Sequence, residues 1–209
     1  ALAEELGVPD VPVPSDAVDR THPDGALDVA SFARAVAATM PDDAIVSDEA
    51  TTSGIFLGHE TQNCPPHDWM MLTGGAIGQG MPLATGAAVA CPDRPVLNVQ
   101  ADGSAMYTIQ SLWTQAREDL NVTTVLLNNR SYAVLNLELQ AVGAVADGAK
   151  ALSMLDLRRP DLDFVSISQG MGVPAVQVDT ADGLSRELER AYAEPGPHLI
   201  EAMIPSSVR

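Results

Sequence analysis

The chain has 209 residues, enough for one domain with a full hydrophobic core. Its net charge of −17 argues against nucleic acid or an anionic membrane as a partner. We find neither a signal-peptide pattern nor an apolar run of the roughly 18 residues that a membrane span needs. Cys64 and Cys91 stand apart, without a CxxC or Cys/His cluster, which indicates a reducing, cytoplasmic setting and no structural zinc.

Residues 1–25 contain Pro9, Pro12, Pro14 and Pro23 among small and acidic residues. Such a composition is typical of an extended linker between domains. We therefore expect 1–25 to be the remnant of an interdomain linker in a longer parent protein, and residues 26–209 to form the domain.

Strands and helices are expected to alternate along the rest of the chain. Apolar runs and helical periodicity predict, in chain order, a helix at 28–40, strands at 44–47 and 69–72, a helix at 78–91, a strand at 95–100, a helix at 108–120, a strand at 122–127, helices at 132–142 and 162–171, a strand at 175–178, a helix at 183–193 and a strand at 197–203. Residues 143–160 form a looser, charged connection where we expect a mobile loop. The alternation predicts an α/β fold, a three-layer αβα sandwich around a mostly parallel central sheet.

Two of these strands end in polar groups that suit a metal ion. The strand at 95–100 runs into Asp102-Gly103-Ser104, and the strand at 122–127 runs into Asn128-Asn129-Arg130-Ser131. If the strands are neighbours, these ends lie side by side, and carboxylate, amide and carbonyl oxygens are ligands that Mg²⁺ accepts. Gly103 allows a close approach of the backbone to an anion, and a following helix leaves N–H groups for a phosphate. Each segment by itself is also typical of an ordinary turn.

Taken together, with Asn129 following Asp102 by 27 residues, the two segments resemble the thiamine-diphosphate signature. The segments at 74–82, 91–94, 111–114 and 196–201 are also similar to the C-terminal, diphosphate-binding domain of the acetolactate synthase and benzoylformate decarboxylase family. The resemblance covers nearly the whole chain and implies the cofactors thiamine diphosphate and Mg²⁺.

The resemblance also implies roles at the diphosphate end of the cofactor. Mg²⁺ would be bound by Asp102, the Asn129 side chain and the Ser131 main-chain carbonyl. Cofactor contacts beyond the metal ligands would come from Thr51, Thr52, Gly103, Ser104 and Tyr132. For the two threonines, a helix-capping pair is the alternative. Ala101 replaces the glycine that is usual before the aspartate, and we expect its methyl group to be tolerated.

At the reactive end, Ile77 would wedge under the cofactor and bend it, which brings its amino group against the thiazolium C2–H. The Gly75 carbonyl would accept a hydrogen bond from that amino group, so both residues count as catalytic candidates. Val134, Leu135 and Glu138 would face the substrate. Pyruvate decarboxylases carry a catalytic Glu where this chain has Leu135, which weighs against that activity.

The family's catalytic Glu belongs to an N-terminal pyrimidine-binding domain of a neighbouring subunit, so the resemblance implies a homodimer or homotetramer. Glu49 cannot replace it, and we expect Glu49 to be an exposed loop acid. We therefore predict the diphosphate half of a 2-oxoacid decarboxylase or carboligase that acts on a small 2-keto acid and is inactive by itself. A stand-alone cofactor-binding subunit with a separate partner chain is the alternative. A Rossmann nucleotide domain is disfavoured, because 74–80 contains no GxGxxG pattern.

Overall fold

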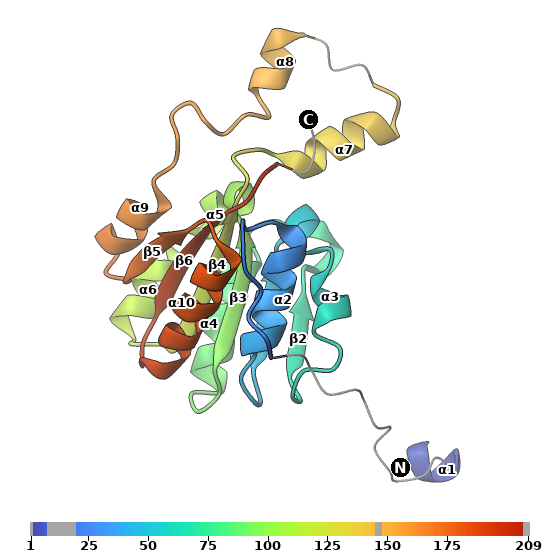
Figure 1. Ribbon diagram of the computed structural model, residues 1–209, viewed down its shortest axis with the longest axis vertical. Coiled ribbons are helices and arrows are strands. Elements are labelled where there is room, and N and C mark those ends of the chain that lie inside the picture. Colours follow the sequence, from blue (N-terminus) through green and yellow to red (C-terminus); the bar gives the residue numbers. More distant parts are fainter. Residues whose placement is uncertain (1, 8–19, 145–147, 207–209) are drawn as a thin grey trace.

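A single six-stranded sheet forms the centre of the molecule (Figure 1). The structure is a computed structural model that describes residues 2–7, 20–144 and 148–206. The strand order is β2-β1-β3-β4-β6-β5, and every pairing of neighbours is parallel. The strands are β1 (Ile45–Glu49), β2 (Asp68–Met71), β3 (Val96–Ala101), β4 (Val122–Asn128), β5 (Ala175–Val178) and β6 (His198–Met203).

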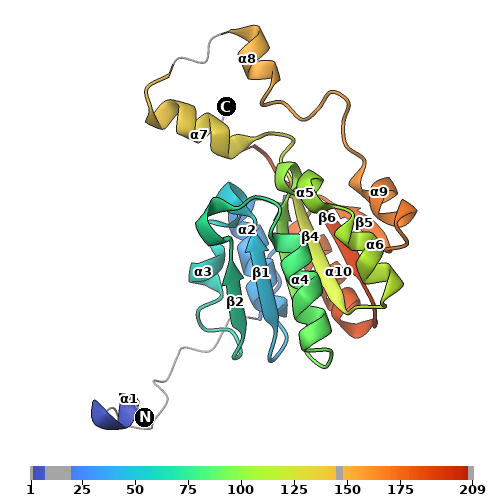
Figure 2. The ribbon, with the colours of Figure 1, turned by 180° about the vertical axis from the view of Figure 1, so that it is seen from behind.

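Helices cover both faces of the sheet, as Figures 1 and 2 show from opposite sides. One face carries α2 (Val29–Thr39), α3 (Leu57–Glu60) and α10 (Ala181–Ala193), and the other carries α4 (Gly80–Ala90), α5 (Asp102–Thr108), α6 (Ser111–Arg117) and α9 (Phe164–Gly170). The remaining elements are α1 (Leu2–Glu5), the 3-10 turns η1 (Thr51–Gly54) and η2 (Thr73–Gly75), α7 (Ala133–Ala141) and α8 (Ala149–Ser153). The predicted three-layer sandwich is confirmed.

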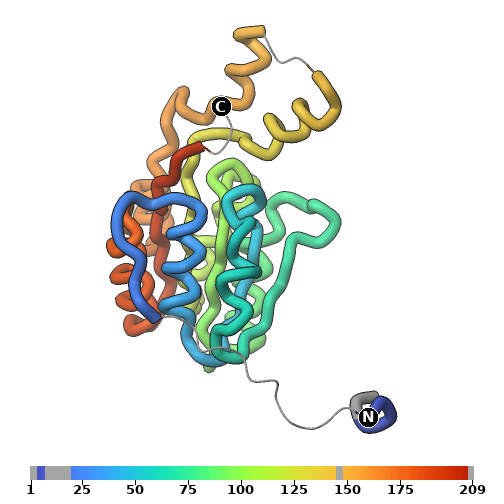
Figure 3. The backbone as a smooth tube through the Cα atoms, turned by 45° about the vertical axis from the view of Figure 1, so that its right-hand side comes forward, coloured from blue at the N-terminus to red at the C-terminus, as the bar shows by residue number. Residues whose placement is uncertain are grey.

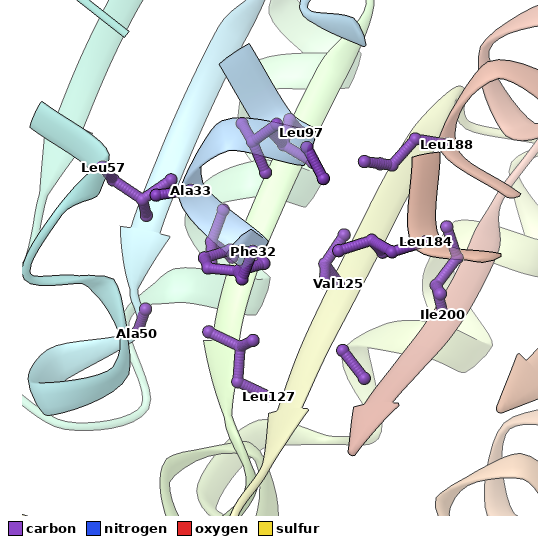
Figure 4. Packing of buried hydrophobic residues seen from close by; sticks show 14 of the residues in the cluster. Phe32, Ala33, Ala50, Leu57, Leu97, Val125, Leu127, Leu184, Leu188 and Ile200 are labelled. Atoms are coloured by element: carbon purple, nitrogen blue, oxygen red, sulfur yellow. The ribbon is translucent and has the colours of Figure 1, made fainter. Parts of the chain in front are cut away.

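The central strands β3 and β4 are buried along their whole length because both of their faces are covered, and most of their side chains are apolar, although Asn98, Gln100 and Thr124 are buried in them as well. In β4, Val125 and Leu127 point toward α2 and α10, whereas Leu126 points to the cluster of α4, α5 and α9. Figure 4 shows the first of these cores around Phe32, which is fully buried beside Leu97. This packing fixes the register of the strands and hence the positions of the strand ends.

The first long helix begins where its sequence predicts. The Asp28 carboxylate accepts hydrogen bonds from the N–H groups of Ala30 and Ser31, at 3.0 and 2.7 Å, and Ser31 Oγ accepts the Asp28 N–H at 2.9 Å. This capping box satisfies N–H groups that have no partner inside the helix. The hydrogen bond from the Ser31 N–H is the largest of several causes that lower the pKa of Asp28.

The expected bounds of one helix and one strand were wrong. The helix expected at 108–120 begins at Asp102 and is divided into α5 and α6, because Gly103 and Ser104 form the first turn of a helix that leaves β3 directly. The strand expected to stop at residue 47 continues to Glu49, which pairs with Gln100 inside the sheet.

The ends of the domain carry further expectations. Most of the expected linker, residues 8–19, lies outside the described residues, while Gly25 already joins the domain through its carbonyl, which accepts the Ala181 N–H at 2.9 Å. Within the expected loop, 145–147 lie outside the described residues and α8 is helical. Along the described ranges, no helix is long and apolar enough to cross a membrane.

The strand order explains where a ligand can enter. From β1 the chain turns outward to β2, then crosses back to β3 on the other side of β1. The connection after β1 therefore lies on the α2 face, and the one after β3 lies on the α4 face. Between two such diverging connections a crevice opens at the carboxyl edge of a parallel sheet. The segment with α7 and α8 extends beyond this same edge (Figure 3).

Candidate functional site

A cavity of about 340 Å³ lies at this carboxyl edge. Its lining brings together predicted site residues from four parts of the chain: Thr51, Thr52, Ile77, Asp102, Gly103, Ser104, Asn129, Ser131, Tyr132, Val134 and Leu135. Gly75 and Glu138 are not among the lining residues. Ala101, which precedes the aspartate, also lines the cavity, and the members that the sequence did not predict are Tyr107, Ala133, Met154 and Leu155.

Asp102 joins the end of β3 to the turn after β4. Its Oδ1 accepts the Gly103 N–H at 2.8 Å, and its Oδ2 accepts the Arg130 N–H at 2.7 Å. The side chain is only 1% exposed, and this burial raises its pKa to about 6 although the two N–H groups oppose the shift. A buried carboxylate with a raised pKa is one that a bound cation would stabilise in its charged form.

The Asn129 side chain closes the turn that follows β4. Its Oδ1 accepts the Ser131 N–H at 2.9 Å, and its Nδ2 donates to Ser53 Oγ of η1 at 3.4 Å. Arg130, which lies between Asn129 and Ser131, has a φ of 57°, in the left-handed region. These bonds direct the Asn129 carboxamide into the space between β4 and η1, next to Asp102.

The Asn128 side chain is hydrogen-bonded to the buried carboxylate of Glu201 on β6. Its Nδ2 donates to Glu201 Oε1 at 2.7 Å, and its Oδ1 accepts the Arg130 N–H at 3.0 Å. Glu201 Oε2 in turn accepts from Gln177 Nε2 at 3.0 Å. Through this chain of contacts, β5 and β6 fix the turn that carries Asn129.

The candidate donors at this site are oxygen atoms, which suit a hard divalent cation such as Mg²⁺. Among the described residues, no cluster of three or more His, Cys, Asp or Glu side chains is placed to hold a metal. A metal here would depend on one carboxylate, an amide oxygen, a main-chain carbonyl and oxygens of a ligand, which is how Mg²⁺ is commonly bound with phosphates. The Ser131 carbonyl accepts the Ala133 N–H at 2.8 Å and retains a second lone pair.

Around the diphosphate candidates the backbone is compact. At Gly103, an added Cβ would lie 2.4 Å from Tyr132 Cε1, so the tyrosine ring rests directly on this glycine. Ala101 has φ −88° and ψ 152°, an extended conformation open to any residue. An alanine here therefore brings no backbone strain. Both Thr51 and Thr52 lie in η1, and Thr51 has a positive φ of 51°.

Ile77 also lines the cavity; it lies on an exposed loop and is itself 44% exposed. Its N–H donates to the Gly75 carbonyl at 2.9 Å. The loop is attached to β1 by Glu49, whose two carboxylate oxygens accept the N–H groups of Gly78 and Gly80, each at 2.5 Å. Glu49 is 1% exposed, so the expectation of an exposed loop acid was wrong.

Part of the cavity lining is apolar. Val134 and Leu135 of α7 belong to this part together with Met154 and Leu155, which come from the segment expected to be only a loop. The Tyr132 N–H donates to the Leu155 carbonyl at 3.0 Å and attaches this segment to the start of α7.

Comparison with known proteins identifies the family of the chain. Residues 50–202 match the family described as thiamine pyrophosphate enzyme, C-terminal TPP binding domain. A Mycobacterium tuberculosis protein named after the acetolactate synthase large subunit (IlvX) is 53% identical over 209 residues, which is 100% of this chain and 41% of that protein. The benzoylformate decarboxylase of Pseudomonas aeruginosa is 34% identical, over 78% of this chain and 30% of that enzyme.

Solved structures give the same result. The thiamine diphosphate-dependent 4-hydroxybenzoylformate decarboxylase of Rhodococcus jostii RHA1 superposes with a TM-score of 0.78 at 31% identity. That superposition covers 93% of this chain and 36% of the decarboxylase. The chain thus spans well under half the length of the relatives that it matches.

Proposed function

The chain belongs to the thiamine pyrophosphate enzymes as a C-terminal TPP-binding domain of the acetolactate synthase and benzoylformate decarboxylase type, and we propose that it binds Mg²⁺ and the diphosphate of thiamine diphosphate (the same compound as thiamine pyrophosphate). The metal ligands are Asp102, the Asn129 side chain and the Ser131 carbonyl. The observation that carries this proposal is the buried Asp102 carboxylate, which lines the cavity together with the Asn129 side chain.

The composition of the lining supports a metal-dependent site. Among the described residues that line the cavity, none is Lys or Arg. The charge of a diphosphate must then be balanced by a metal and by N–H groups. Gly103 and Ser104 in the first turn of α5, with Thr51, Thr52 and Tyr132 around them, are the proposed protein contacts to the cofactor.

When bound, thiamine diphosphate supplies a carbon nucleophile that adds to a 2-keto acid and holds the electron pair left as carbon dioxide departs. The chain's own residues bind and orient. The Ile77 side chain would contact the bound cofactor, and the Gly75 carbonyl, which accepts the Ile77 N–H, would also accept a hydrogen bond from the cofactor's amino group. Val134 and Leu135 contact the substrate and keep water from the apolar part of the cavity.

We propose that the longer protein is a 2-oxoacid decarboxylase or carboligase. An N-terminal pyrimidine-binding domain must supply the acidic group that completes the site, in a homodimer or homotetramer, so the chain alone binds the cofactor but turns over no 2-keto acid. The apolar Leu135 disfavours a pyruvate decarboxylase, in which a carboxyl group stands at this position.

Calorimetric titration with thiamine diphosphate, with and without Mg²⁺, tests the metal assignment. We expect binding by the wild-type chain only when Mg²⁺ is present, and a loss of at least roughly tenfold in Asp102→Ala, which removes a charged ligand. Asp93→Ala serves as the control, because Asp93 is an exposed acid remote from the cavity. Equal affinity in the wild type and Asp102→Ala would refute the assignment.

A further inference from the structure

The loop that carries Ile77 is fixed at its base and exposed at its tip. The segment from Thr73 to Ile77 is exposed, whereas Gly78 and Gly80 are buried. Both glycine N–H groups donate to the Glu49 carboxylate, one to each oxygen. The Glu49 side chain of β1 therefore fixes the backbone directly after Ile77, at Gly78 and Gly80.

The two glycines are needed for this close approach. A Cβ on Gly80 would lie 2.7 Å from Glu49 Oε2 and 2.6 Å from Gln100 Oε1. Gly78 has a φ of 95°, and a Cβ there would lie 2.9 Å from Tyr107 Cβ. Only glycine allows the backbone to come this near to the carboxylate and to adopt this conformation.

The carbonyls of the same two glycines are also bound. Ser47 Oγ, on β1, donates to the Gly80 carbonyl at 2.9 Å, and Thr108 Oγ1, on α5, donates to the Gly78 carbonyl at 3.0 Å. Gly78 is thus held from β1 and α5, and Gly80 is held twice from β1. The Ile77 side chain, in contrast, is held mainly by its own backbone, since it projects into the cavity.

A buried carboxylate is expensive to desolvate and is retained only where it accepts good hydrogen bonds. Both oxygens of the Glu49 carboxylate accept N–H groups at the base of one loop, and the exposed part of that loop ends at Ile77, the residue proposed to bend the cofactor. A residue that holds a ligand in a strained conformation must itself be rigidly placed, because a small displacement of that residue would let the ligand relax.

We propose that Glu49 is a positioning residue that fixes Ile77 against the thiamine part of the cofactor. This inference rests on the proposed function and deepens it. Glu49 is not among the residues that line the cavity, whereas the proposed diphosphate ligands Asp102 and Asn129 are, so we expect its effect to be confined to ligands that reach Ile77.

Titration with two ligands separates this role from a general structural one. Thiamine diphosphate would contact both Asp102 and Ile77, whereas inorganic pyrophosphate would occupy only the Asp102 side, and each is titrated with Mg²⁺. Glu49→Gln places an amide NH₂ against a glycine N–H and removes one of the two bonds. We expect Glu49→Gln and Ile77→Ala each to lower the affinity for thiamine diphosphate roughly tenfold, and to change the affinity for pyrophosphate less than about twofold.

Because Glu49 acts through Ile77, the double variant should bind thiamine diphosphate no more weakly than the weaker single variant. Independent losses that multiply in the double variant would overturn the inference, as would an equal loss of pyrophosphate affinity in Glu49→Gln. If the wild type binds neither ligand, the proposed function itself is overturned.

A thermal unfolding curve shows whether Glu49→Gln is folded. Should it fail to fold, Ser47→Ala and Thr108→Val provide the test, since each removes one carbonyl anchor and leaves the carboxylate bonds in place. Each should lower the affinity for thiamine diphosphate by a factor of about three to five, with pyrophosphate unchanged. No change in thiamine diphosphate affinity in either variant would overturn the inference.

Discussion

Glu201 on β6 gives a sharp test of how the turn after β4 is stabilised. Its carboxylate accepts hydrogen bonds from Asn128 at 2.7 Å and from Gln177 at 3.0 Å, and it is buried. In Glu201→Gln, one oxygen can still accept from Asn128, and the exposed Gln177 can rotate its amide to accept from the new NH₂ group. Both bonds then survive but lose their charge, at about 1 kcal/mol each, so the free energy of unfolding should fall by about 2 kcal/mol.

Guanidinium denaturation followed by circular dichroism measures this change, and a parallel thermal scan should show a fall in Tm of roughly 4–8 °C for a domain of this size. The matched control is Glu118→Gln, the same substitution in an exposed ion pair with Arg117 at 3.2 Å, where about 0–1 kcal/mol is expected. Adding Gln177→Glu to Glu201→Gln restores one charged bond and should recover about half of the loss. A Glu201→Gln variant as stable as the Glu118→Gln control would refute this reasoning.

Three further substitutions test the packing and the helix start. Phe32 is fully buried, so Phe32→Ala should cost about 3–5 kcal/mol of unfolding free energy in a denaturant titration, far more than the same change at the exposed Phe56. Because the pKa of Asp28 is lowered in the folded state, its carboxylate stabilises the fold at neutral pH. This stabilisation is lost as the pH falls through the folded-state pKa, which lies below the ordinary Asp range. Asp28→Ala should therefore lower the free energy of unfolding by about 1 kcal/mol near pH 7, and the difference from wild type should shrink in acid. In Gly103→Ala the new Cβ would overlap the Tyr132 ring, and the near-ultraviolet dichroism should change with a loss of about 1–3 kcal/mol; an unaltered spectrum and Tm would contradict the contact.

The strand ends at Asp102 and Asn128 were predictable because their signal is local. Each follows an apolar run, and such runs mark parallel strands covered on both faces. The parallel arrangement then places their carboxyl ends at one edge, where the cavity lies. The pairing of two distant segments at that edge required only the assumption that the strands are neighbours, which β3 and β4 are.

Glu49 was misjudged because its partners are remote in the sequence. The strand β1 ends in Ser47-Asp48-Glu49, a polar run that is typical of a loop. Only the N–H groups of Gly78 and Gly80 make burial of the carboxylate favourable, and no periodicity around Glu49 contains them. Met154 and Leu155 were missed for a similar reason, since two apolar residues in a charged connection give no sign of the cavity that they line.

The position of β6 has a consequence for how the chain folds. His198–Met203 is the last strand in the sequence, yet it lies inside the sheet between β4 and β5. During synthesis β1 to β4 can pair, but the backbone N–H and C=O groups along the edge of β4 that faces β6 stay unpaired until this strand has emerged. Such an open edge is a site for pairing with other chains. We therefore expect the steps that seat β6 to limit the folding rate, and chains halted before residue 198 to aggregate.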